Sequence, residues 1–305
     1  MHSDHSVTSL RKKPNSMHQQ LYDKVKRSIH IIKRMESVAL KYRQDGFIVA
    51  FSGGKDSQCI RALANMAEVQ HIVKYQWTTI DPPEVLHFIR DQYPDVIIER
   101  PEETFWQLCY RHGILPTQYK RFCCRELKES RDHSCVTITG VRAAESPKRA
   151  IRQEVEIQTR RRHPDYVRGT LDQFNMYKES HVDCIMGKDK LIVNPIIDWS
   201  EQDVWDFLHY IDQPTCSLYD RGYKRVGCLF CPMASRSSLH RMERDYPKYR
   251  QAFIRLIHRI RAKRINSGGY DIYSTLTDEE VFYAWLNKIS YKTMLAKKTQ
   301  LTIPF

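Results

Sequence analysis

The chain has 305 residues, of which 41% are hydrophobic and 28% are charged. This composition is typical of one large folded domain or two smaller ones, and it excludes a disordered chain and a small disulfide-stabilised scaffold. No stretch approaches the roughly 18 consecutive apolar residues of a spanning helix, which excludes an integral membrane protein. The formal net charge is +13, from 49 basic and 36 acidic residues, and such an excess favours a polyanionic partner.

The nine cysteines are an odd number in a long chain, and the N-terminal residues lack the apolar core of a secretion signal. We therefore expect reduced thiols that serve metal or sulfur chemistry, and not a disulfide framework. The expected compartment is the cytoplasm.

The first part of the chain predicts a helix and then a strand. Residues 1–16 read as a basic arm without a packing pattern. Over residues 17–42 apolar side chains recur at helical spacing, which predicts an amphipathic helix. The continuous apolar run at 47–51 predicts a buried parallel strand. A glycine turn, a helical stretch over 56–69 and a second apolar run at 71–75 follow.

Further strand-like segments at 96–98, 135–139 and 191–193 alternate with helical patterns. This alternation predicts an α/β fold with an open, mostly parallel sheet. Strand signals fade after about residue 200, where three helices are predicted instead, over 201–211, 246–265 and 278–288.

The sequence Ser52-Gly-Gly-Lys-Asp-Ser57 lies directly between the first predicted strand and a predicted helix. Gly53 and Gly54 permit a close backbone approach, and the amides that open a helix bind anionic phosphate oxygens. Lys55 adds a cation, and Ser52 and Ser57 add hydroxyl donors. The spacing is neither the Walker pattern nor a dinucleotide fingerprint. We predict a phosphate-binding loop, with an ordinary serine-capped turn as the alternative.

Residues 139–149 follow another predicted strand and contain Gly140, Arg142 and Arg149. The two arginines offer fork-shaped donors suited to phosphate or sulfate oxygens, and the alternative is a solvated basic loop. In the later stretch 194–205, Ser200 with Asp203 three residues on predicts a capping box, so we interpret that stretch as mostly structural.

Two cysteine pairs stand far apart in the sequence: Cys123-Cys124 and Cys228-x-x-Cys231. Four thiolates can hold a tetrahedral zinc ion or a [4Fe–4S] cluster, and the remaining alternative is that these thiols bind no metal. Basic residues flank both pairs, and cations near thiolates lower their pKa and offset the charge of a thiolate-ligated group, or contact a phosphate backbone. The flanking residues are Lys120, Arg121, Arg125, Lys128, Lys224 and Arg225. The other five cysteines are predicted to be packing thiols: Cys59, Cys109, Cys135, Cys184 and Cys216.

Residues 52–57 resemble the PP-loop of ATP pyrophosphatases, and residues 139–149 resemble a nucleotide-facing stretch of the phosphoadenosine-phosphosulfate (PAPS) reductase-like branch of that superfamily. The two cysteine pairs resemble the cluster-binding pattern of adenosine-phosphosulfate reductases and of the ATP pyrophosphatases of DNA phosphorothioation (DndC/SspD-like). The resemblance implies a PP-loop (adenine nucleotide alpha hydrolase-like) sheet that binds ATP and Mg²⁺.

The resemblance also assigns roles to residues of this chain. It implies Lys55, Asp56 and Arg142 as catalytic groups and Cys123, Cys124, Cys228 and Cys231 as ligands of a [4Fe–4S] cluster. The nucleotide-binding residues that it implies are Ser52, Gly53, Gly54, Lys55, Asp56, Ser57, Gly140, Arg142 and Arg149. The expected division is a basic arm at 1–16, the catalytic domain with the cluster cysteines at 17–235 and a helical C-terminal region at 236–305.

Sulfonucleotide reductases of this family carry a nucleophilic cysteine in a Glu-Cys-Gly-Leu-His-type motif near the C-terminus, and no cysteine follows Cys231 here. Without that thiol the covalent reductase mechanism has no evident carrier. We therefore expect adenylation of a nucleic-acid backbone oxygen for DNA phosphorothioation. The alternatives are a sulfonucleotide reductase that borrows Cys184, Cys216 or another chain's thiol, a tRNA thiolation enzyme and a non-catalytic ATP-binding defence subunit.

The expected partners are DNA, a cysteine desulfurase as sulfur donor and other phosphorothioation-system proteins, with no membrane. Candidate DNA contacts are the run Arg160-Arg-Arg-His163 with Arg168, beside Tyr166 and Phe174, and the charged face of the helix over 246–265. Binding through such phosphate contacts weakens steeply as salt rises.

Overall fold

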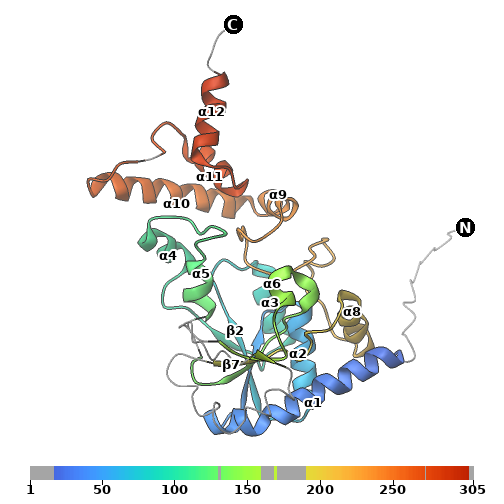
Figure 1. Cartoon of the computed structure of the whole chain (residues 1–305). Helices are drawn as coiled ribbons and strands as arrows, with labels where there is room; N and C mark the ends of the chain where they lie inside the picture. The colour runs from blue at the N-terminus through green and yellow to red at the C-terminus, as the bar shows by residue number, and fades with distance from the viewer. Residues whose placement is uncertain (1–16, 130–131, 159–167, 170–189, 272, 302–305) are drawn as a thin grey trace, which may run out of the picture. The chain divides into compact units, whose positions relative to one another are not determined.

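The structure is a computed structural model that describes residues 17–129, 132–158, 168–169, 190–271 and 273–301 (Figure 1). The strands are β1 (Phe47–Phe51), β2 (His71–Gln76), β3 (Ile97–Glu99), β4 (Val136–Ile138), β5 (Val155–Gln158), β6 (Arg168–Gly169) and β7 (Lys190–Val193). The longer helices are α1 (Gln19–Tyr42), α2 (Lys55–Met66), α3 (Pro83–Gln92), α4 (Phe105–His112), α8 (Glu201–Tyr210), α9 (Arg236–Asp245), α10 (Pro247–Asn266), α11 (Asp278–Leu286) and α12 (Tyr291–Leu301). Short turns are the helical α5 (Phe122–Cys124) and α6 (Pro147–Ala150), the π-helical η1 (Arg125–Glu129) and the 3₁₀-helical η2 (Ala143–Glu145).

The strands form one sheet in the order β3-β2-β1-β4-β7-β5-β6. β1 pairs in parallel with β4, where Ile48 lies opposite Thr137, and β4 pairs in parallel with β7. β5 runs antiparallel to both β7 and β6. This arrangement confirms the predicted α/β class with an open, mostly parallel sheet.

The helices and strands predicted from the sequence are all present, with boundaries shifted by a few residues. β5 and β6 were not predicted, because β5 alternates polar and apolar residues over four positions and β6 has two residues. The helix α9 was not predicted either, because only Leu239 and Met242 of its ten residues are buried. Among the described helices, none combines the length and apolar character needed to cross a bilayer.

The chain divides into two compact units that interleave in sequence. The first unit is Met1–Lys74, Pro94–Val96 and His133–Cys216. In this unit α1 packs against α2 and β1 (Figure 1). The predicted apolar stripe of α1, including Leu21, Ile32 and Met35, is buried. The second unit is Tyr75–Tyr93, Ile97–Asp132 and Ser217–Phe305. The expected ranges 1–16, 17–235 and 236–305 stay a prediction.

The second unit has an aromatic core around Phe253 of α10. The Phe253 ring stacks on Trp285 with centroids 5.1 Å apart and meets the ring edges of Phe230 and Phe105 at 5.2 and 5.7 Å. Aromatic pairs at these separations add about 0.5–1.5 kcal/mol each beyond the area they bury. The core ties α10 and α11 to α4 and to the segment that carries Cys228 and Cys231.

Candidate functional site

The predicted phosphate-binding loop follows β1 at a switch point of the sheet. In the strand order, β2 lies on one side of β1 and β4 on the other, so the connections that leave these strands diverge. Because β1 and β4 are parallel, their carboxyl ends share one edge, and ligands of open α/β sheets bind in the crevice outside such a point. Residues 52–54 follow β1 there, and residues 139–142 follow β4.

The loop has the backbone geometry that its glycines suggest. Gly53 adopts a φ of 70°, in the left-handed region that favours glycine. Gly54 caps α2 without a side chain, which leaves the positive end of that helix to bind an anionic group. The Ser57 hydroxyl donates to the Gly54 carbonyl at 2.8 Å and accepts from the Ser52 amide at 3.1 Å. These two bonds hold the turn in shape.

Two buried cations meet one carboxylate at the start of α2. Lys55 is 1% exposed and Arg142 is 3% exposed. The Lys55 Nζ lies 3.4 Å from Asp56 Oδ2, and Arg142 Nε donates to Asp56 Oδ1 at 2.6 Å. Because both oxygens of Asp56 face cations, Asp56 orients Lys55 and Arg142. Lys55 Nζ also lies 3.7 Å from the exposed carboxylate of Glu201, the first residue of α8, which the sequence did not indicate.

Gly140 allows the segment after β4 to approach the loop. A Cβ at this position would lie 3.0 Å from the backbone carbonyl carbon and oxygen of Asp56, which are not free to move away. The glycine therefore permits the close approach that brings Arg142 to Asp56.

A Gly140→Ala substitution is expected to lower the free energy of unfolding by about 1–3 kcal/mol, the usual cost of overpacking. It is also expected to weaken binding of the ATP that the loop is predicted to hold, by separating Arg142 from Asp56. Chemical denaturation and a nucleotide-binding titration measure the two effects. Gly227→Ala is the matched control, since a Cβ there meets nothing within 4 Å. Equal stability and equal ATP affinity in both variants would show that the close approach has no role.

Arg149 is held within its own turn. It forms an ion pair with Glu145, and Glu145 also accepts a hydrogen bond from the Arg142 amide at 3.2 Å. One third of the Arg149 side chain is exposed. Arg149 is thus oriented by Glu145, a partner that the sequence did not indicate, and its predicted contact with a nucleotide stays a prediction.

The four predicted cysteine ligands line one small cavity of the second unit. Cys123 and Cys124 lie on α5, and Cys228 and Cys231 flank the buried pair Leu229-Phe230. All four cysteines line a cavity of about 30 Å³. Cys228 Sγ lies 3.4 Å from Thr78 Oγ1, and the Leu229 amide donates to the Ile80 carbonyl at 2.8 Å. The segment after β2 therefore anchors the second pair, a contact that no sequence motif signalled.

Cations perturb the thiols of this cavity. Donation from the Cys123 thiol and from Arg121 lowers the pKa of Cys124, although burial opposes that shift. Burial raises the pKa of Cys228 to about 12 despite the nearby ammonium of Lys128. The charge of Cys228 in turn raises the pKa of Lys128. The flanking cations thus lower the pKa of Cys124, as predicted, whereas at Cys228 the effect of burial outweighs that of Lys128.

Within the described part of the chain, no three His, Cys, Asp or Glu side chains are placed as ligands of a single metal ion. The role of the four cysteines as metal or cluster ligands therefore stays a prediction. Four of the other five cysteines are buried, as expected for packing thiols: Cys59, Cys109, Cys135 and Cys216. Cys184 lies outside the described residues.

The candidate DNA contacts divide into two groups. Arg160–His163, Tyr166 and Phe174 lie outside the described residues, and Arg168 lies in β6. On α10, most of the predicted basic residues already have intramolecular partners. Arg261 pairs with Asp271 and Asp278, Arg250 pairs with Glu243, and Lys263 donates to the Tyr110 carbonyl. The charges of Arg250 and Arg261 are therefore neutralised within the second unit and are less available to DNA than the sequence suggests.

The chain matches the family described as the phosphoadenosine phosphosulfate reductase domain over residues 46–234. It is 27% identical over 244 residues to the uncharacterized protein MJ0973 of Methanocaldococcus jannaschii, covering 77% of this chain and 53% of that protein. It is 25% identical over 158 residues to an adenosine 5'-phosphosulfate reductase of Staphylococcus epidermidis, covering 48% of this chain and 53% of that one. The chain thus spans about half the length of the curated relatives it matches. Among solved structures, a phosphoadenylyl-sulfate reductase from Candida auris covers 71% of this chain and 98% of its own with a TM-score of 0.42 and 15% identity.

Proposed function

Since the chain belongs to the phosphoadenosine phosphosulfate reductase domain family, we propose that it is an ATP pyrophosphatase that adenylates a backbone oxygen of a nucleic acid. The modification is sulfur insertion of the DNA phosphorothioation type. The observation that carries the proposal is the glycine loop, where Lys55 and Arg142 are buried beside the N-terminus of α2.

The loop supplies what transfer of an adenylyl group requires. An oxygen of the backbone phosphate attacks the α-phosphorus of ATP, the bond from that phosphorus to the α,β-bridging oxygen breaks, and pyrophosphate leaves. Negative charge develops on the leaving pyrophosphate. Hydrogen-bond donors that already point at this position lower the activation free energy by several kcal/mol, because they need not reorganise during the reaction. Lys55 and the amides that open α2 are those donors. Asp56 is a positioning residue that fixes Lys55 and Arg142.

Mg²⁺ bound to the ATP phosphates would neutralise part of their charge. We assign no protein ligand to it, because both oxygens of Asp56 already face cations. Adenylation joins AMP to the oxygen that sulfur will replace, so that this oxygen can depart as part of AMP, which is a good leaving group. The outer sulfur of a cysteine desulfurase persulfide, which we propose as the nucleophile, then attacks the backbone phosphorus and displaces AMP. A thiol reductant cleaves the S–S bond and leaves the phosphorothioate.

The four cysteines that line the small cavity fit a thiolate-ligated group by their donor chemistry. We propose that Cys123, Cys124, Cys228 and Cys231 hold a [4Fe–4S] cluster, which when bound supplies electron-transfer or sulfur chemistry. Lys128 and Arg121 would offset the negative charge that four thiolates bring, since both lie beside cavity thiols. Zinc is the alternative occupant of the same four thiols.

The acceptor is tested by measuring pyrophosphate and AMP release from ATP with double-stranded DNA, with tRNA or with no nucleic acid. The assay uses anaerobically prepared protein together with a cysteine desulfurase and other phosphorothioation proteins. We expect release that depends on DNA. Release that depends on tRNA would support a thiolation enzyme, and ATP binding without release in every mixture would support a non-catalytic subunit.

The second candidate is a sulfonucleotide reductase, which is favoured by the similarity to an adenosine 5'-phosphosulfate reductase over 158 residues. Arg142 suits a sulfate as well as a phosphate, because its fork of donors matches either anion. Sulfite release from adenosine phosphosulfate in the presence of thioredoxin tests this function. Sulfite release without pyrophosphate release from ATP would contradict our proposal.

A further inference from the structure

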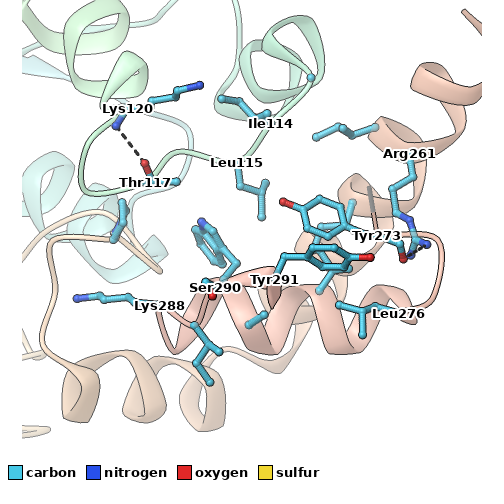
Figure 2. Close-up of a pocket in the computed structure, with 18 of the residues that line it drawn as sticks. Ile114, Leu115, Thr117, Lys120, Arg261, Tyr273, Leu276, Lys288, Ser290 and Tyr291 are labelled. Carbon is cyan, nitrogen blue, oxygen red and sulfur yellow. Dashed lines mark hydrogen bonds between the residues drawn. The ribbon is translucent and has the colours of Figure 1, made fainter. Parts of the chain in front are cut away.

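A second cavity lies within the second unit, lined by none of the loop residues or the four cysteines. Its volume is about 600 Å³, in the range of small-molecule sites. The segment 113–120 forms one wall, and residues of α10, α11 and the start of α12 form the other (Figure 2).

The helical wall is apolar and firmly placed. Ile257 and Ile260 of α10 and Val281 of α11 line it. Trp285 stacks on Phe253 and donates its indole N–H to the Pro116 carbonyl at 2.7 Å, which ties α11 to the opposite wall. The rings of Tyr273 and Tyr291 meet edge to face with centroids 5.5 Å apart (Figure 2). The cavity therefore presents flat aromatic rings that are held in place by packing and hydrogen bonding.

The charged side chains that line the cavity among the described residues are all positive. Four cationic residues line it, and none of the described lining residues is Asp or Glu. Arg261 is neutralised by Asp271 and Asp278. Arg264 and Lys288 instead donate to the carbonyls of Gly113 and Ala234, which carry no formal charge to balance theirs. Lys120 is exposed at the edge of the opposite wall. A ligand with a negative charge would balance this excess.

The rim adds an aromatic ring and an amide. Tyr119 is 95% exposed, and Gln118 beside it is exposed as well. Bases of single strands stack on exposed aromatic rings while nearby cations follow the backbone, and Tyr119 with Lys120 offers such a pair. A glutamine amide carries both the donor and the acceptor needed at a base edge. A fatty acyl anion would use the apolar wall and the cations but has no use for Tyr119 and Gln118.

We propose that this cavity binds one nucleotide unit, with its base against the aromatic surfaces and its phosphate near Lys120, Arg264 and Lys288. The bound nucleotide is either part of a nucleic-acid strand or a free mononucleotide, and the chemistry of the cavity suits both. The identification of that strand as the substrate rests on the proposed function. The binding itself does not, because the cavity shares no residue with the glycine loop.

The test is a fluorescence-anisotropy titration of the full chain with labelled (dT)8, together with calorimetric titrations with dTMP and with dodecanoate. Tyr119→Ala removes an exposed ring and is expected to weaken (dT)8 binding by about tenfold. Lys120→Glu is expected to reduce the slope of log affinity against log salt by about 0.7, the share of one phosphate contact on a single strand. The controls are Tyr270→Ala and the charge reversal Arg90→Glu, at exposed residues of the same unit that lie outside the cavity lining and outside α10.

If only the two cavity variants lose affinity for (dT)8, the result supports the nucleotide site and shows that it binds a nucleic-acid strand. If these variants weaken dTMP binding and leave (dT)8 unchanged, the site takes free mononucleotides. The proposal is overturned if the cavity variants bind both (dT)8 and dTMP as the controls do. It is also overturned if the cavity variants differ from the controls only in their affinity for dodecanoate. Intact (dT)8 binding in a chain that releases no pyrophosphate from ATP would refute the proposed function and leave this site standing.

Discussion

A Lys55→Met variant is expected to release pyrophosphate from ATP about 100-fold to 1,000-fold more slowly than the natural chain. Methionine keeps most of the buried side-chain volume and removes the charge, so the loss reports on electrostatics. Lys55 is 1% exposed, and water cannot replace its charge beside the leaving pyrophosphate. Single-turnover assays at saturating ATP measure the effect on the chemical step.

The control for this variant is Lys33→Met, which removes an exposed charge from α1. We expect that control to retain its rate within about twofold, since exposed charges are screened by water and salt. Thermal unfolding of both variants separates lost catalysis from lost structure. A folded Lys55→Met chain with an unchanged rate would remove Lys55 from the mechanism.

A Cys228→Ser variant is expected to lose the bound iron and the visible absorption of the anaerobically reconstituted protein. Serine is close in size to cysteine, but its alkoxide is a poor ligand for iron at neutral pH, and a cluster that loses one of four thiolates is destabilised. We expect about four iron and four sulfide ions per natural chain, and close to none in the variant. Iron and sulfide assays with an absorption spectrum measure this.

Cys109→Ala is the control for the cluster, because Cys109 is a buried thiol of the same unit that does not line the small cavity. Its iron content should equal that of the natural chain. Equal iron in Cys228→Ser and the natural chain would contradict the assignment. One zinc ion per chain, lost in Cys228→Ser, would keep the four-cysteine site and refute the cluster.

The parts of the site that are local in sequence were predictable. The apolar run of β1, the two glycines and the polar start of α2 are adjacent, and each acts through a rule of backbone conformation or helix capping. The capping box of Ser200 and Asp203 is present as predicted, with a hydrogen bond of 3.1 Å from the Asp203 amide to Ser200 Oγ. Such features depend on a few neighbouring residues, so the sequence determines them directly.

The partners of these residues were not predictable, because they come from distant segments. Arg142 reaches Asp56 across 86 positions, and Thr78 reaches Cys228 across 150. The same limit explains α10, whose arginines read as a free basic face although Arg261 is paired with two aspartates of later segments. A sequence shows how many charges a helix carries, and only the fold shows which of them are already neutralised.

The central claim is that a backbone oxygen of the nucleic acid attacks the α-phosphorus of ATP. DNA with ¹⁸O in its non-bridging phosphate oxygens tests it directly in the complete sulfur-insertion reaction, with the AMP product analysed by mass spectrometry. We expect one ¹⁸O atom in each AMP and one sulfur in each modified phosphate, because the oxygen that sulfur replaces leaves with AMP. AMP that carries oxygen from water alone would contradict it.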